Sequence, residues 1–243
     1  MAFHPCFARQ QPEKGFLAGV LLSARTINDE AMSSLVYRGA TAGVTLRFLA
    51  AHPHITHDVA AWGASGRLQD KSRQSSLREN EFGAAYQCLF PFQQSRGLRF
   101  SLGGEISSFL QLREHQDYNN NPAYYVFNSS IGPVVKGTYE FSGRWQLSTS
   151  LFCPAASLLS VSRGTANKEN DFYSSTWKSI LKNTQPAFWN RYAGLGINTI
   201  LYLPVGETNR LYFAWKWQYY RIGDTGDLQS AANTITVNYY FSL

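Results

Sequence analysis

Apolar and polar residues alternate with a period of two along most of this chain. Between Arg99 and Arg113, charged or polar residues such as Glu105 and Gln111 occupy one parity, and large apolar residues occupy the other. The apolar members are Phe100, Leu102, Ile106, Leu110 and Leu112. Because successive side chains of a strand point to opposite faces, this pattern predicts a strand with one apolar and one polar face.

The same alternation predicts about ten strands, most of them longer than the roughly 5–6 residues of an ordinary strand. They are expected at Gly15–Arg25, Leu35–Ala50, His54–Leu68, Phe82–Phe92, Leu98–Arg113, Tyr124–Phe141, Trp145–Ser162, Phe188–Leu203, Arg210–Ile222 and Ala231–Leu243. Strands of this length suit a tilted crossing of a bilayer, which needs about 9–11 residues.

The connections between these strands are predicted to alternate between long and short. The long ones are expected at Thr26–Ser34, Gln69–Glu81, Glu114–Ala123, Arg163–Ala187 and Gly223–Ser230. The short ones are expected at Ala51–Pro53, Gln93–Gly97, Ser142–Arg144 and Pro204–Asn209. A soluble meander has no reason to gather its long loops at one end, whereas a transmembrane β-barrel does so.

This architecture resembles that of the bacterial outer-membrane β-barrels. The likeness covers Gly15–Leu243 and rests on the even strand number, the one-sided loops and an aromatic-rich last strand with Phe241 near its end. It implies an all-β, single antiparallel up-and-down transmembrane β-barrel with short periplasmic turns and long extracellular loops. It also implies a place in the bacterial outer membrane, in contact with lipid and lipopolysaccharide. Residues 1–14 are then an N-terminal segment, either a leader remnant or a periplasmic tail.

The polar parity is expected to face the lumen and the apolar parity to face lipid. A soluble lipocalin-like barrel, with its apolar parity turned inward, is the alternative. If the apolar parity faces lipid, the lumen contains a polar network of Gln87, Glu105, Lys136 and Lys216. Within it, an ion pair between Glu105 and Lys136 is a hypothesis. Large residues also point inward and predict a filled lumen, namely Phe109, Tyr124, Phe152, Tyr192, Tyr202, Tyr212 and Tyr220.

Three arginines interrupt the apolar parity near the long-loop ends of their strands: Arg38, Arg191 and Arg221. A charge is tolerated at the membrane interface, so we predict that these side chains bind lipid phosphates, with frayed strand ends as the alternative. Cys88 and Cys153 fall on the apolar parity of strands that are not neighbours, and lipid-facing, unpaired thiols are expected.

Candidates for catalysis and metal binding are weak. His52, His54 and His57 form a short histidine run, but His57 points away from His54 on a strand, so no metal site is expected. His115 and Asp117 share a parity in a long loop and are the weak catalytic candidates, by similarity to the omptin-type outer-membrane proteases. We expect no cofactor. The net charge of +6 is dispersed along the chain, so no nucleic-acid partner is expected.

The longest connection carries a short amphipathic pattern at Trp177, Ile180 and Leu181, which predicts a helix over the barrel mouth, on a partner, or on neighbouring loops. Taken together, the sequence favours a structural, partner-binding or accessory role in an envelope complex. Two alternatives stay open. One is a narrow pore for small anions, because Arg47 and Arg210 lie at its turn-side mouth, and the other is an omptin-like or lipid-hydrolysing enzyme.

Overall fold

The computed structural model describes residues 13–30, 33–95, 97–116, 123–141, 145–166, 172–205, 209–223 and 227–243. The elements are β1 (Glu13–Asp29), β2 (Ser33–Ala51), β3 (Thr56–Gln69), β4 (Ser76–Ser95), β5 (Leu98–His115), β6 (Ala123–Phe141), β7 (Trp145–Phe152), β8 (Ala156–Ala166), α1 (Phe172–Asn183), β9 (Gln185–Ala187), β10 (Tyr192–Val205), β11 (Asn209–Gly223) and β12 (Asp227–Ser242). Within the described ranges, no helix has the length and apolar character that a membrane crossing requires.

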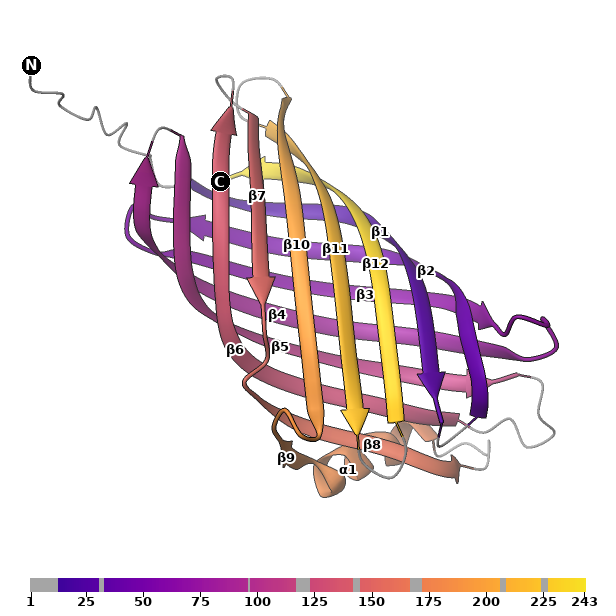
Figure 1. Cartoon of the computed structure of the whole chain (residues 1–243). Coiled ribbons are helices and arrows are strands. Elements are labelled where there is room, and N and C mark those ends of the chain that lie inside the picture. Colours follow the sequence, from indigo (N-terminus) through magenta and orange to yellow (C-terminus); the bar gives the residue numbers. More distant parts are fainter. Residues whose placement is uncertain are drawn as a thin grey trace, which may run out of the picture.

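Antiparallel pairing closes these strands into one barrel (Figure 1). The ladder runs in chain order from β1 to β6, continues through β7, β10, β11 and β12, and returns to β1. Gly15 pairs with Ser242, so the first and last strands close the wall. Since β7 and β8 are two halves of one wall strand, the barrel has ten strands, as the alternation predicts.

The two ends of the barrel differ. One end holds the first residues of β1 and the last residues of β12, and it is called here the turn end. Its connections are 52–55, 96–97, 142–144 and 206–208. The other end, with the connections 30–32, 70–75, 116–122, 167–184 and 224–226, is called the loop end. The helix α1 belongs to the loop end (Figure 1).

At the loop end, several strands run further than the alternation predicts. The strand β1 continues to Asp29 and β2 begins at Ser33, so the long connection predicted at Thr26–Ser34 is wrong. The strand β4 already begins at Ser76, so the connection predicted at Gln69–Glu81 is shorter than expected. The long connection predicted at Gly223–Ser230 is wrong for the same reason. Here polar residues such as Asp29 and Glu79 are buried inside the barrel, and the apolar alternation that marks a strand is lost.

Asp70 organises the connection between β3 and β4. Its carboxylate accepts hydrogen bonds from the hydroxyl of Ser72 and from the backbone N–H groups of Ser72 and Ser75, the last at 2.9 Å. These bonds, the Ser72 hydroxyl first, lower the pKa of Asp70 below its ordinary value because they favour the charged form. Arg73 in the same turn has a φ of 59°, a left-handed conformation that turns accommodate.

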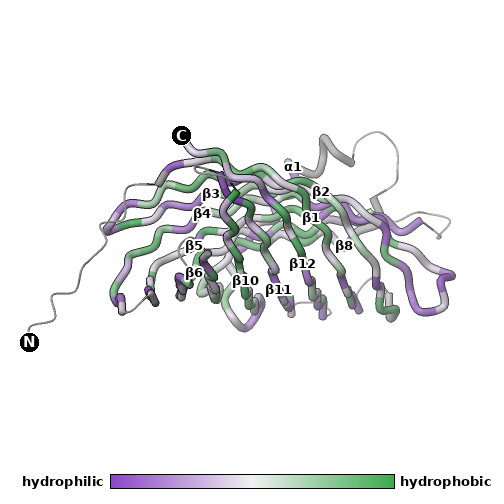
Figure 2. Tube along the Cα trace, turned by 90° about the horizontal axis from the view of Figure 1, so that it is seen from above, coloured by the Kyte–Doolittle hydropathy of each residue, from purple (hydrophilic) through white to green (hydrophobic). Residues whose placement is uncertain are grey.

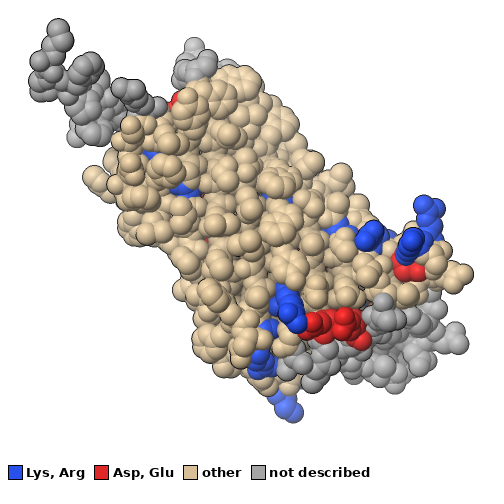
Figure 3. All heavy atoms as spheres, viewed as in Figure 1, with Lys and Arg blue, Asp and Glu red and all other residues tan. Residues whose placement is uncertain are grey.

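The outer wall of the barrel is apolar. Val20, Val44 and Leu46 are 61%, 62% and 62% exposed, and large apolar residues on the other strands point outward in the same way. Hydropathy alternates along the strands in Figure 2, and Figure 3 shows a wall face largely free of charge, with charged residues gathered at the loop end. A continuous apolar outer surface is favourable in contact with the hydrocarbon of a bilayer and unfavourable in contact with water. The apolar parity therefore faces lipid as predicted, and the lipocalin-like alternative is wrong.

The seventh wall strand is interrupted between β7 and β8. Phe152 opposes Val134 and Ala156 opposes Ile131, so this strand carries one residue more than β6 over the interval, which defines a β-bulge. Pro154 lies in the bulge and has no N–H to donate to a ladder. The prediction of one regular strand at Trp145–Ser162 is therefore wrong at the bulge.

The helix predicted from the amphipathic pattern is confirmed as α1. Its position is neither over the barrel mouth nor on neighbouring loops, as the sequence analysis had considered. Ile180 is buried against Leu112 and Tyr125, which point outward from β5 and β6. The helix thus packs on the outer wall at the loop end and not over the barrel mouth. Trp177 and Leu181 are exposed on its free side, at 59% and 81%.

Candidate functional site

Two clusters of buried aromatic and aliphatic side chains fill the two ends of the lumen. The turn-end plug consists of Leu17, Leu49, Ile200, Tyr202, Tyr212 and Tyr240. The loop-end plug consists of Ile27, Tyr37, Leu68, Leu77, Phe109, Tyr124, Val126, Leu159, Ala187, Tyr192, Tyr220, Ile222 and Leu228. The aromatic filling predicted from the sequence is confirmed for six of its seven residues, which are buried in these plugs, and Phe152 is half-buried between them.

The plugs are tightly packed. In the turn-end plug, the ring of Tyr212 lies edge-on to Tyr202, with centroids 4.4 Å apart, and stacks on Tyr240 at 5.7 Å. In the loop-end plug, Tyr220 contacts Phe109 at 5.4 Å and Tyr192 at 6.1 Å. Aromatic contacts of this kind add to the burial of the rings, so each plug is a small packed core.

Between the plugs lies a cavity of about 170 Å³, called here the luminal chamber. A single water needs about 10–15 Å³ by the same measure, so the chamber holds several waters or a small chemical group. Gln87, Glu105 and Lys216, which the sequence assigns to the lumen, all line it. Lys136 is not among its lining residues.

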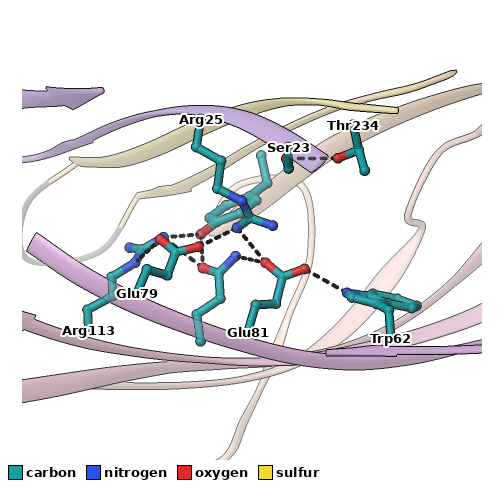
Figure 4. Close-up of polar contacts among 9 residues, drawn as sticks. Ser23, Arg25, Trp62, Glu79, Glu81, Arg113 and Thr234 are labelled. Carbon is teal, nitrogen blue, oxygen red and sulfur yellow. Dashed lines mark hydrogen bonds and ion pairs between the residues drawn. The ribbon is translucent and has the colours of Figure 1, made fainter. Parts of the chain in front are cut away.

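A buried ionic network crosses the lumen beside the chamber. Arg25 on β1 forms ion pairs with both Glu79 and Glu81 on β4, and all three side chains are almost completely buried (Figure 4). The strands β1 and β4 are not neighbours in the wall, so these pairs brace the barrel across its interior. An arginine can bridge two carboxylates in this way because its planar guanidinium presents several donors.

Arg113 on β5 completes the charge balance of this network. Its Nε lies 3.2 Å from Oε2 of Glu79, and its NH2 group donates to Gln111 at 2.7 Å and to the hydroxyl of Tyr220 at 2.9 Å. The Tyr220 hydroxyl in turn donates to the Gln111 side-chain oxygen at 2.5 Å. Two arginines thus face two glutamates, and burial of the ions is offset by pairing and hydrogen bonds.

Glu81 is held on its other side by neutral donors. Nε2 of Gln111 and Nε1 of Trp62 both lie 2.7 Å from its carboxylate oxygens. The Trp62 ring covers Gly83, where an added Cβ would lie 2.2 Å from the indole. The network was missed in the sequence because Glu79 and Glu81 fall in a segment predicted as a loop, although extending the β4 alternation would have placed both in the lumen.

The two predicted partners Glu105 and Lys136 do not meet. The register places Glu105 opposite Gly132 and Lys136 opposite Ser101, which separates the two side chains by four residues or about 13 Å along the strand. Glu105 instead accepts a hydrogen bond from Gln87, with Nε2 and Oε2 2.5 Å apart. The hypothetical ion pair is therefore wrong, because only the register, which the sequence does not reveal, sets the height of each residue.

Lys216 occupies a different setting from the other luminal charges. Its Nζ lies 5.1 Å from the centroid of the Trp62 ring, a cation–π contact. No carboxylate of the described ranges forms an ion pair with it. By contrast, Arg47 is bound by Asp58 through two hydrogen bonds, one from Nε at 2.6 Å. Lys216 thus lines the chamber without forming an ion pair in the described part of the chain, and its charge interacts with that of Glu105, another lining residue.

The three predicted rim arginines all lie at the loop end of the wall. Arg38 is exposed on β2. Arg191 precedes β10 and donates to the side chain of Gln185 at 3.0 Å. Arg221 is exposed on β11 and forms an ion pair with Asp227 at 2.6 Å. The positions agree with an interfacial height, while the lipid-phosphate role stays a prediction.

The weak catalytic and metal candidates are only partly covered by the described residues. His115 is 2% exposed and packs against Tyr37 and Tyr124, with ring centroids 5.4 and 6.0 Å away, whereas Asp117 lies outside the described residues. His57 faces outward and pairs with the hydroxyl of Tyr86 at 2.9 Å. In the described part of the chain, no three metal-ligating side chains come together.

No protein-family model and no curated protein sequence matches this chain. Among solved structures, its fold is similar to the outer membrane protease OmpT of Escherichia coli, with 11% identity over 100% of this chain and 99% of that one, and a TM-score of 0.52. Two further matches are the transport unit of the autotransporter AIDA-I of Escherichia coli (9% identity, 98% and 93% covered, TM-score 0.44) and the translocator domain of NalP of Neisseria meningitidis (7%, 96% and 90%, 0.43). The likeness to OmpT shows the fold alone. That fold and the apolar wall indicate a protein of the bacterial outer membrane.

Proposed function

We propose that this protein is a closed outer-membrane barrel with a structural, partner-binding or accessory role in an envelope complex, and not a diffusion pore. The observation that carries the proposal is the filling of the lumen by packed side chains at both ends. A solute crossing the barrel along its axis would have to displace Tyr202 and Tyr212 at one end and Tyr192 and Tyr220 at the other. Small barrels are commonly filled by their own side chains in this way.

The narrow, anion-preferring pore is the alternative that this proposal opposes, and planar bilayers separate the two. We expect the wild-type barrel, inserted and heat-modifiable, to show no stepwise conductance. A variant with Tyr202→Ala, Tyr212→Ala, Tyr192→Ala and Tyr220→Ala should conduct, because both plugs are then opened. Steady anion-selective steps from the wild-type protein would overturn the closed-barrel proposal.

The envelope role has its own test in the source organism. Loss of a structural or accessory barrel should make the outer membrane leaky, so deletion of the gene should raise sensitivity to vancomycin, which is too large for ordinary pores. Uptake of small anions should be unchanged. A deletion strain with reduced anion uptake and an intact barrier to vancomycin would support the pore instead.

Lipopolysaccharide is part of the proposal as a partner at the loop end. Its support is the exposed, outward position of Arg38 on β2 and of Arg221 on β11, with Arg191 just before β10, the strand that pairs with β11. Guanidinium groups at an interface bind phosphates through paired hydrogen bonds. No observation favours an enzyme in the same way, since the ring of His115 is buried beneath two tyrosines.

A further inference from the structure

Three arginines lie on the outer face of adjacent strands at the loop end of the barrel. Arg38 belongs to β2, Arg67 to β3 and Arg78 to β4, and all three side chains are exposed. Arg67 lies directly opposite Arg78 in the ladder between β3 and β4. Arg38 lies opposite Gln69, which is two positions along β3 from Arg67, so all three arginines point to the same side of the wall. We call this set the arginine cluster.

The register brings the three side chains close together. Residues directly opposite each other on antiparallel strands have Cβ atoms about 4.5–5.5 Å apart, and diagonal neighbours are about 7–8 Å apart. Arg67 and Arg78 are opposite each other, and Arg38 is diagonal to Arg67. Like charges that lie directly opposite on a sheet are destabilising. The wall therefore carries an electrostatic cost at Arg67 and Arg78 that a bound anion would remove.

The neighbouring carboxylates do not balance the arginine cluster. Among the described residues that the ladders place opposite its members, Glu114 is the one carboxylate, and it faces Arg78. Glu114 can neutralise one of three guanidinium charges. Asp70 is buried in the turn between β3 and β4, but Lys71 and Arg73 are exposed in the same turn and outweigh it. An excess of positive charge therefore stays on this part of the outer face.

The guanidinium group of Arg67 is held on the outer face by the hairpin itself. Its NH2 group donates to the hydroxyl of Ser76 at 2.6 Å. Ser76 lies opposite Gln69, so this bond directs the guanidinium along the outer face toward the loop end. A guanidinium presents several N–H donors in one plane, so it can bind a hydroxyl and an oxyanion at the same time.

The outer face changes from charged to polar to apolar below the arginine cluster. The side chains of Ser65 and Asn80 come next along β3 and β4 and are joined by a hydrogen bond of 2.7 Å. Phe82 follows, 54% exposed, four residues or about 13 Å along the strand from Arg78. A phosphorylated glycolipid has the same order of groups, namely phosphate, sugar and acyl chains. The face thus complements such a lipid along its whole length.

We propose that the arginine cluster binds a phosphate group of lipopolysaccharide in the outer leaflet, with the acyl chains of that lipid against the apolar wall below. The inference rests on the proposed lipopolysaccharide partner and deepens it, because it gives one site on β2–β4 that includes Arg67 and Arg78. The strands β12 and β1 separate this site from Arg221 on β11. The phosphate offsets the repulsion between the opposed arginines and accepts paired hydrogen bonds from them.

Native mass spectrometry of the folded barrel in detergent counts bound lipid directly, with no bilayer present. The full chain, refolded without lipopolysaccharide, is titrated with diphosphoryl lipid A. Arg67→Gln with Arg78→Gln should weaken binding at least about tenfold, because two charge-assisted contacts are lost. The matched control is Lys71→Gln with Arg73→Gln, which removes the same charge from the turn of the same hairpin. It should weaken binding less than about twofold, since only the long-range field changes.

Two results of this titration would overturn the site. One is unchanged binding by the folded Arg67→Gln, Arg78→Gln protein. The other is an equal loss in the two double variants, because binding would then follow net charge and not the opposed pair.

Three further arms identify the bound group and its source. Lipid A without its phosphates should bind at least about tenfold more weakly than diphosphoryl lipid A, and equal binding would overturn the phosphate assignment. Excess inorganic phosphate should not displace the lipid, because it has no acyl chains for the wall, and displacement would overturn the lipid source. EDTA should leave the complex intact, since guanidinium groups and not a bridging metal ion hold the phosphate. Loss of the lipid in EDTA would overturn direct binding by the arginines.

The repulsion itself is tested with Arg78→Gln, which keeps the bond between Arg67 and Ser76. In lipid-free detergent, this variant should unfold at the same temperature as the wild type or at a higher one, because the like-charge contact is removed. Added diphosphoryl lipid A should raise the unfolding temperature of the wild type more than that of the variant. A lipid-free variant that is less stable than the wild type, or does not fold, would overturn the premise of an opposed, repulsive pair.

Failure of this inference is distinguishable from failure of the proposed function. A wild-type barrel that binds no lipid A would contradict the lipopolysaccharide partner as a whole. A barrel that binds lipid A equally well with and without Arg67 and Arg78 would contradict the arginine cluster alone. Neither result changes the bilayer conductance, which tests the closed barrel.

Discussion

At the residue scale, the interior of this barrel is organised by charges that meet across the lumen. Glu79 is fully buried and lies between the guanidinium groups of Arg25 and Arg113. Removing one partner of such a network leaves a buried ion uncompensated, which costs far more than losing an ion pair in water. The network is therefore expected to contribute more to the free energy of unfolding than the exposed ion pairs do.

Replacing Glu79 by Leu should lower the free energy of unfolding by about 3–5 kcal/mol, because two arginines then share one carboxylate. Urea unfolding in liposomes, followed by tryptophan fluorescence, measures the change. The control is Asp227→Asn, which breaks the exposed pair with Arg221 and should cost at most about 1 kcal/mol. Equal effects of the two substitutions would show that the luminal network does not brace the barrel.

The rim arginines give a second prediction at this scale. Changing Arg38 and Arg191 to Gln should reduce the amount of lipopolysaccharide that co-purifies with the barrel, since two phosphate-binding groups are lost at the loop end. Phosphate assay of the purified protein measures it. Lys14→Gln, an exposed cation at the turn end, is the control and should change nothing. An unchanged phosphate content in the double variant would contradict the lipid-phosphate role.

At the scale of elements, Ile180 is the one buried side chain among residues 177–183 of α1, and it packs on the outer wall. Ile180 contacts Leu112 and Tyr125, while its neighbour Leu181 is free. A helix of this length is marginal on its own, so its order depends on this packing. The two adjacent residues thus form a natural pair for comparison, because they are isomers of equal size in opposite environments.

Ile180→Ala should detach α1 and expose the bonds after Lys178 and Lys182 to trypsin, because the lost contact is worth about 2–5 kcal/mol. Limited proteolysis of the folded barrel, read by mass spectrometry, detects the cut. Leu181→Ala removes a similar volume from the exposed side and should leave the cleavage rate unchanged. Similar rates for both variants would mean that the wall contact does not order the helix.

At the scale of the whole molecule, the apolar wall sets how the barrel sits in the membrane. Val44 lies midway along β2 and pairs with Val20, whereas Val36 lies near the loop end of the same strand. Both point outward from the wall. The energy of a charge on the lipid face depends on its depth, so these two positions report where the hydrocarbon begins and ends.

Val44→Lys should lower the free energy of unfolding in a bilayer by about 2–4 kcal/mol, and Val36→Lys by about 0–1 kcal/mol. Reversible unfolding in large unilamellar vesicles gives both values under the same conditions. A cost at position 36 as large as that at position 44 would mean that the hydrocarbon reaches the loop end, and the interfacial placement of the rim arginines would then fail.

The local pattern of the chain determined much of this protein. Period-two alternation predicted ten strands, their lipid-facing parity and the inward tyrosines such as Tyr202 and Tyr212, because the direction of a side chain on a strand depends only on its place in the alternation. The spacing of Trp177, Ile180 and Leu181, at i, i+3 and i+4, likewise predicted the helix α1. These features need no knowledge of which strand lies beside which, so a single sequence was enough.

Only the tertiary structure decided which luminal groups meet and where the wall is interrupted. Register sets the height of each residue in the barrel, and it joined Arg25 to Glu79 and separated Glu105 from Lys136. Beyond the bulge at Pro154, β8 pairs with β6 and β9, whereas β10 pairs with β7. Both depend on closing ten strands into one cylinder, a constraint between distant segments that no local pattern carries.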